Sequence, residues 1–118
     1  MGSLVVVHGH TGEAEVLSLI GQLDLSSVGR LVSQAADAIR HGRTRIILDL
    51  AGVEFVDSAG LAGLMNVLRR ADRAGGGVVL VHVSEDLQRL LSLTRLDREF
   101  AFADTLPLAA AKLSALSA

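Results

Sequence analysis

A serine and an aspartate stand side by side in the run Val56-Asp57-Ser58-Ala59-Gly60, where an apolar segment gives way to an amphipathic one. A serine hydroxyl can act as a nucleophile, accept a phosphoryl group or cap a helix. A nucleophile elbow requires Gly-Xaa-Ser-Xaa-Gly, and Val56 occupies the place of the first glycine, so that pattern fails. Spacing alone favours a helix N-cap at Asp57 or Ser58, which would satisfy a free backbone N–H.

The other residues able to do chemistry do not form a recognisable site. Of the four histidines, only His8 and His10 are close in sequence, and the chain has no cysteine. Strand neighbours or solvated side chains explain these histidines better than a metal or catalytic centre. The glycines at 75–77 precede a strand, which suits a helix stop and not a phosphate-binding loop. The sequence therefore predicts no catalytic residue, no metal and no cofactor, and it leaves small-molecule binding open.

Composition narrows the class of protein further. The chain has 118 residues, half of them apolar, which suits one domain with its own core. A net charge of −2 and the absence of Trp and Tyr argue against nucleic acid as a partner. No apolar stretch is long enough to span a bilayer, so no membrane insertion is expected. With no cysteine, the fold depends on packing alone, and a cytoplasmic location is expected.

The elements that would position Ser58 follow from hydrophobic periodicity and from turn residues. The expected segments begin with a hairpin of strands at Leu4–Val7 and Ala14–Leu23 and a helix from Val28 to about Gly42, for which Ser26 and Ser27 are cap candidates. A strand around Ile46–Leu48, a helix from Ser58 to the glycines at 75–77 and a strand at Val78–Val83 follow. The last segments are a helix capped by Ser84, a strand with Phe100 and Phe102, and a helix over Leu106–Leu113. This order predicts one α/β domain with a mixed, mostly parallel sheet of about five strands packed with about four helices.

The helix that begins at Ser58 has an unusual second face. If its leucines point inward, then Ala59, Gly63, Asn66 and Arg70 point outward. An exposed glycine costs a helix about 0.5 to 1 kcal/mol relative to alanine, so Gly63 needs a reason. A glycine at this position would allow a partner's backbone to approach the helix closely, which would explain why it is there. The pattern thus favours a docking face at the start of this helix.

Three motifs resemble one known family. Gly21-Gln22-Leu23-Asp24, Leu48-Asp49-Leu50 and Phe55-Val56-Asp57-Ser58-Ala59-Gly60-Leu61 are similar in sequence and spacing to the signature of STAS anti-sigma factor antagonists. The resemblance continues through Gly76-Gly77, the run from Arg89 to Thr94, Leu96-Asp97 and Phe100. It covers nearly the whole chain, which implies a single STAS domain over residues 1–118.

The resemblance implies a phosphorylation switch that regulates transcription, for example in a stress response. In this family, the serine that follows the motif's aspartate is phosphorylated by an anti-sigma factor that is also a serine kinase. That serine is Ser58 here. The unphosphorylated antagonist sequesters the anti-sigma factor and frees a sigma factor; phosphorylation ends this, and a phosphatase restores it. The expected partner-binding residues are Asp24, Asp57, Ala59, Gly60, Gly63 and Asn66.

Two features stay open at this point. Similar domains also serve as non-catalytic STAS subunits of transport complexes or of larger stress-signalling assemblies, so that role is the alternative. In addition, Arg95 stands where the family commonly carries a glycine suited to ending a helix. This departure makes the local helix end uncertain but does not affect the expectation for Ser58.

Overall fold

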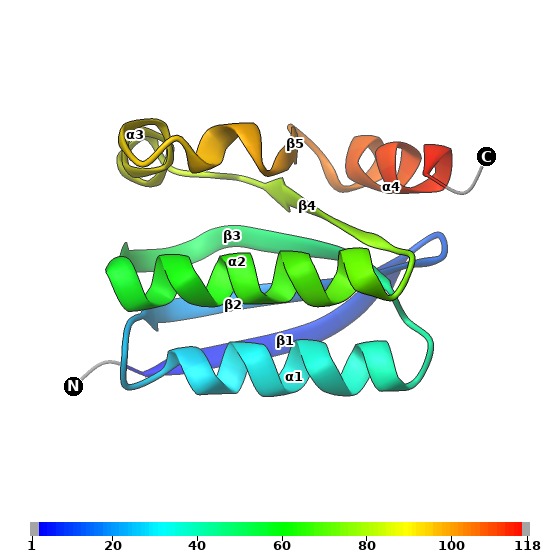
Figure 1. The fold of residues 1–118 in the computed structure, drawn as a ribbon, viewed down its shortest axis with the longest axis horizontal. Coiled ribbons are helices and arrows are strands. Elements are labelled where there is room, and N and C mark those ends of the chain that lie inside the picture. Colours follow the sequence, from blue (N-terminus) through cyan, green and yellow to red (C-terminus); the bar gives the residue numbers. More distant parts are fainter. Residues whose placement is uncertain (1–2, 117–118) are drawn as a thin grey trace.

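A five-stranded sheet with the order β1-β2-β3-β4-β5 organises the molecule, whose computed structural model describes residues 3–116 (Figure 1). The strands are β1 (Leu4–Thr11), β2 (Ala14–Leu23), β3 (Arg45–Val56), β4 (Gly77–Val81) and β5 (Ala101–Ala103). Only β1 and β2 pair antiparallel, and every later pair is parallel. The predicted mixed, mostly parallel α/β sheet is therefore confirmed.

The β1–β2 hairpin is longer than predicted. β1 continues beyond the predicted end at Val7 through His8, Gly9 and His10 to Thr11, so the strand is four residues longer. Gly12 makes this turn with φ +59°, a conformation that favours glycine. β2 begins and ends where the sequence predicted.

β3 is the central strand, and it extends far beyond its apolar start. Ile46, Ile47 and Leu48 are fully buried, as the continuous apolar run indicated. The strand then continues to Val56 because its second half pairs with the second half of β2, after two register shifts near Ile20 and Gly21. These irregularities are consistent with bulges, which bend a strand.

Residues 3–116 contain four α-helices. Three of them connect successive strands: α1 (Val28–Arg40), α2 (Ser58–Arg73) and α3 (Glu85–Leu93), and α4 (Leu106–Ala115) follows β5. Figure 1 shows α1 and α2 side by side in front of the sheet, and the two helices are in contact. Ser84 caps α3 by accepting a hydrogen bond from the N–H of Leu87 at 3.1 Å, as predicted. None of the helices within residues 3–116 combines the length and apolarity needed to cross a bilayer.

Each face of the sheet has its own core. On one face, leucines of the strands pack against Leu31 of α1, Leu64 of α2 and Leu91 of α3. On the other face, a smaller core joins the strands to Ala109 and Leu113 of α4. Burying a leucine completely stabilises the folded state by about 1.5 to 3 kcal/mol, so the larger core dominates the packing energy.

A short 3₁₀ helix, η1 (Leu96–Arg98), follows α3 and was not predicted. Arg95 joins the two helices with φ +62°, in the left-handed region. This is the conformation for which glycine is suited. Arg95 therefore replaces the family's usual glycine but adopts the same left-handed conformation, and α3 still ends here.

Candidate functional site

The ends of β2 and β3 lie side by side and form the candidate site. Leu23 is in register with Val56, and the backbone N–H of Asp57 donates to the carbonyl of Leu23 at 3.3 Å. Each strand is followed at once by an aspartate, Asp24 after β2 and Asp57 after β3. α1 begins four residues after Asp24, and α2 begins directly after Asp57. In parallel sheets, function gathers at this edge, outside the carboxyl ends of the strands.

Asp57 is the N-cap of α2, which resolves the choice between Asp57 and Ser58. Its backbone is extended, and its Oδ1 accepts a hydrogen bond from the N–H of Gly60 at 2.8 Å. Ser58 is therefore the first helical residue, and its side chain is exposed. Among residues 3–116 the Ser58 hydroxyl has no hydrogen-bond partner in the protein. The cap does not use Ser58, so this hydroxyl is free to react.

Asp24 organises the neighbouring turn. Its Oδ1 accepts hydrogen bonds from the hydroxyl of Ser26 at 2.7 Å and from the N–H groups of Ser26 and Ser27 at 3.0 and 3.2 Å. The Ser26 hydroxyl is the main reason that the pKa of Asp24 lies below its ordinary value; the other hydrogen bonds lower it further, and partial burial opposes them. Asp24 therefore carries a negative charge beside Ser58 at neutral pH.

The predicted serine cap of α1 differs in detail. Ser27 occupies the N-cap position but makes no side-chain capping bond. Its hydroxyl instead donates to the carbonyl of Gln22 at 2.6 Å and accepts from the N–H of Asp24 at 3.0 Å. Ser27 thus ties the turn back to the end of β2.

Gly63 is buried, so its predicted exposure is wrong. A Cβ at this position would lie 2.1 Å from Cγ2 of Val28, because α1 packs against this side of α2. Gly60 is also buried, and its Cβ would lie 2.1 Å from the carbonyl oxygen of Leu23. The close approach that these glycines allow is intramolecular, and neither presents a surface to a partner.

The remaining predicted partner-binding residues fall at or near the surface. Ala59 is half-buried, while Asn66 is exposed and accepts a hydrogen bond from Nε of Arg70 at 2.6 Å. The outward row of α2 is Ser58, Ala62, Asn66 and Arg70, at intervals of four residues. The sequence analysis missed Ala62 in this row, and counting in fours from Ser58 would have found it.

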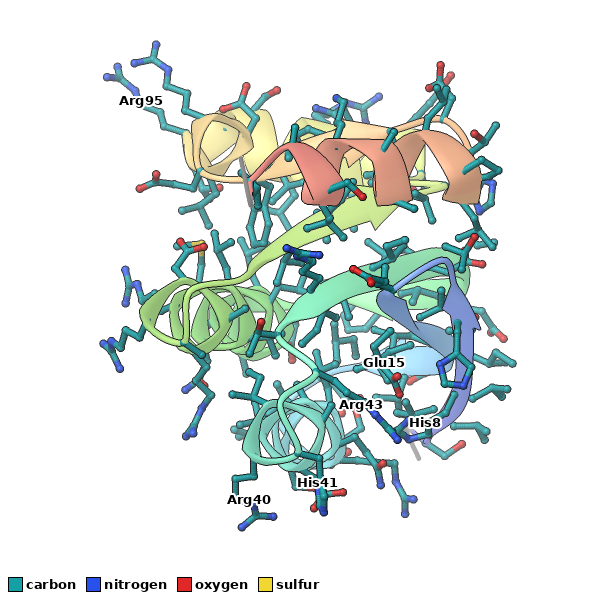
Figure 2. All side chains as sticks on the ribbon, turned by 90° about the vertical axis from the view of Figure 1, so that its right-hand side faces the viewer. His8, Glu15, Arg40, His41, Arg43 and Arg95 are labelled. Carbon is teal, nitrogen blue, oxygen red and sulfur yellow. The ribbon has the colours of Figure 1, made fainter. Side chains whose placement is uncertain are left out.

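The histidines lie away from Ser58. Figure 2 views the molecule from the side that lies at the right of Figure 1, away from the site, where His8 and Arg43 point toward Glu15. The buried Glu15 carboxylate lies 3.4 Å from Nδ1 of His8 and 3.8 Å from Nη1 of Arg43. His82 instead pairs with Asp49 at 2.9 Å. In the described part of the chain, no group of three or more His, Cys, Asp or Glu residues is placed to hold a metal ion.

Comparisons with known proteins show the family to which this chain belongs. A family model described as Mlab, STAS domain, matches residues 6–108. The chain therefore belongs to the STAS domain family, which confirms the resemblance of its motifs. A proposed anti-sigma factor antagonist of Thermotoga maritima is 38% identical over 68 residues, or 58% of this chain and 60% of that protein. The chain thus aligns with less than two thirds of this relative's length.

Solved structures share the fold over most of the chain. The crystal structure of a proposed anti-sigma factor antagonist from Thermotoga maritima is 28% identical, with a TM-score of 0.81, covering 92% of this chain and 94% of that one. SpoIIAA of Bacillus has been solved unphosphorylated and phosphorylated, at 21% and 24% identity, both with a TM-score of 0.70 and covering 92% of this chain, and 96% and 98% of SpoIIAA. At this identity SpoIIAA supports the fold alone.

Proposed function

We propose that this protein is an anti-sigma factor antagonist that is switched off by phosphorylation of Ser58. It binds an anti-sigma factor and thereby releases a sigma factor. The partners are an anti-sigma factor that is also a serine kinase, and a phosphatase that acts on phosphorylated Ser58. The names of the Thermotoga relatives support the general role, and the phosphorylated state solved for SpoIIAA is a precedent within the fold.

The observation that carries the proposal is the free, exposed hydroxyl of Ser58. Because Asp57 caps α2, a phosphoryl group on Ser58 would break no hydrogen bond of the cap. The positive end of a helix dipole also favours an anion by about 0.3 to 1 kcal/mol in exposed positions. The fold should therefore tolerate the modification.

The same phosphate changes the surface strongly. It adds about −1.5 to −2 charges at neutral pH, next to Asp57 and to the turn that carries Asp24. A partner that docks here must desolvate this group, and like charges placed opposite each other at an interface cost several kcal/mol. Since about 1.4 kcal/mol is a tenfold change in affinity, binding should fall by orders of magnitude.

We do not assign Ser58 the role of a catalytic nucleophile. A serine nucleophile needs a base within hydrogen-bond reach, and within residues 3–116 no side chain is bonded to its hydroxyl. The neighbouring carboxylates of Asp24 and Asp57 are already engaged by backbone N–H groups. We therefore propose a binding role and no enzymatic one.

The test joins phosphopeptide analysis to a pulldown from the native host. We expect phosphate on Ser58, and we expect wild type and Ser58→Ala to retain a protein whose sequence identifies it as a kinase-type anti-sigma factor. Ser58→Asp should lose that protein while unfolding at nearly the same temperature. Tight binding by Ser58→Asp would refute the switch. An unmodified Ser58 with a transport-complex partner would instead favour the alternative role as a regulatory STAS subunit.

A further inference from the structure

Leu25 is exposed to solvent on the hydrogen-bonded turn that follows β2. It follows Asp24 directly, and 78% of its side chain is exposed, the largest fraction among the exposed large apolar residues. Single exposed leucines are common on protein surfaces and need no explanation by themselves. The surroundings of Leu25 are what distinguish it.

Several hydrogen bonds hold the turn that carries Leu25 in one conformation. The N–H groups of Ser27 and Val28 donate to the carbonyl of Asp24 at 3.1 and 2.8 Å. The Asp24 carboxylate binds Ser26, and the Ser27 hydroxyl binds Gln22, as described above. All these polar contacts point inward, and the apolar side chain of Leu25 points outward.

The turn is also locked to the start of α2. Gly60 packs against the carbonyl of Leu23, and the N–H of Asp57 donates to that same carbonyl. Leu25 lies in the turn after β2, and Ser58 is the first residue of α2 after β3, so both lie at the same edge of the sheet. Phe55, which is 52% exposed and in register with Gln22, lies at the same end of β3. Leu25 and Phe55 are thus two large apolar side chains that are exposed at the edge of the sheet where α2 begins.

We propose that Leu25 is the apolar anchor of the partner interface, seated in an apolar hollow of the anti-sigma factor, with an arginine or lysine of that partner facing Asp24. This inference rests on the proposed function and adds the chemistry of the partner. A few side chains in well-packed, desolvated pockets carry most of the binding energy of an interface; they are most often Trp, Tyr and Arg, and the contacts around them exclude water. We assign this place to Leu25 because of its exposure and its ordered turn. A preorganised turn lowers the entropy lost on binding, because its backbone is already ordered.

The charge of Asp24 indicates what must lie opposite it. Its pKa is lowered chiefly by the hydroxyl of Ser26, so the carboxylate stays ionised at neutral pH. A charge that loses water at an interface requires an opposite charge, and arginine matches a carboxylate best. Phosphate on Ser58 would add bulk and hydration at the edge of the hollow and keep Leu25 from seating.

The test measures binding of the anti-sigma factor identified in the pulldown, by calorimetry with purified proteins. We expect Leu25→Ala to weaken the Kd at least tenfold, which is about 1.4 kcal/mol. Leu25→Met, which keeps the apolar volume, should bind within about threefold of wild type. The matched control is Leu108→Ala, since Leu108 is also exposed but belongs to α4 on the other face of the sheet. All three variants should unfold at the wild-type urea midpoint, because both leucines are largely solvated.

Each other outcome has a distinct meaning. If Leu25→Ala binds within about twofold of wild type while Ser58→Asp does not bind, the anchor is refuted and the proposed function stands. If wild type binds no anti-sigma factor, the proposed function is refuted and the anchor with it. If light scattering finds a dimer that Leu25→Ala dissociates, the occupant is a second copy of this chain, which also refutes the proposal.

Discussion

The stability of the variant Gly63→Ala tests whether Gly63 is buried between α1 and α2 or faces solvent. In the structure, an alanine Cβ at position 63 would lie 2.1 Å from Cγ2 of Val28 and 3.9 Å from Cγ2 of Val32. The first distance is far below van der Waals contact, so α1 and α2 must separate or Val28 must leave its preferred rotamer. Valine is stiff about χ1 in a helix, which makes the second response costly.

The magnitude follows from two opposing terms. Overpacking a core contact costs about 1 to 3 kcal/mol. Replacing glycine by alanine inside a helix returns about 0.5 to 1 kcal/mol. The net loss of stability should therefore lie between about 0 and 2.5 kcal/mol, which lowers the melting temperature by up to roughly 10 °C for a domain of this size.

Urea denaturation followed by circular dichroism measures this effect, and Val28→Ala supplies the matched background. Without Cγ2 of Val28 the clash disappears, so Gly63→Ala should be neutral or stabilising by up to about 1 kcal/mol in that variant. The double-mutant cycle should thus show a favourable coupling between the two positions. If Gly63→Ala raises the stability of the otherwise wild-type protein, the glycine faces solvent and the reasoning fails.

Two further predictions concern the turn at Asp24 and the helix end at Arg95. The pKa of Asp24 is lower in the folded state, so the contribution of this carboxylate to stability is present above its unfolded-state pKa and is lost as the pH falls through its folded-state pKa. The urea midpoint of the wild-type protein should therefore fall on acidification, and that of Asp24→Asn should fall less. An equal fall of both midpoints would contradict the lowered pKa of Asp24. Arg95→Gly relieves a left-handed backbone at φ +62° and should raise the free energy of unfolding by about 0.5 to 1 kcal/mol in denaturant titrations; a loss of stability would show that the Arg95 side chain stabilises this helix end.

The sequence analysis predicted the place of Ser58 in the fold but not the structural role of each neighbouring residue. Ser58 lies at a junction of strand and helix, as the apolar run and the amphipathic segment predicted. Asp57 is the cap, and spacing could not distinguish it from Ser58 because both residue types cap helices well. Leu25 gave no signal at all, since one leucine in a turn looks the same in sequence whether it is buried or displayed.

The error at Gly63 has a physical cause. Periodicity divides a helix into an apolar and a polar face, and a glycine contributes to neither. Because α1 and α2 cover the same face of the sheet, α2 is buried along two flanks, against the strands and against Val28. No local pattern states that two helices will be neighbours.

The amino-acid sequence by itself determined the order of the elements, the α/β class and the position of Ser58, because these depend on local periodicity and on turn and cap residues. Only the tertiary structure decided that Asp57 alone caps α2, that Gly60 and Gly63 are buried, and that Leu25 is exposed at the edge of the sheet where α2 begins. These features arise from contacts between segments far apart in the chain, which is why the surface around Ser58 could be described only after the fold was known.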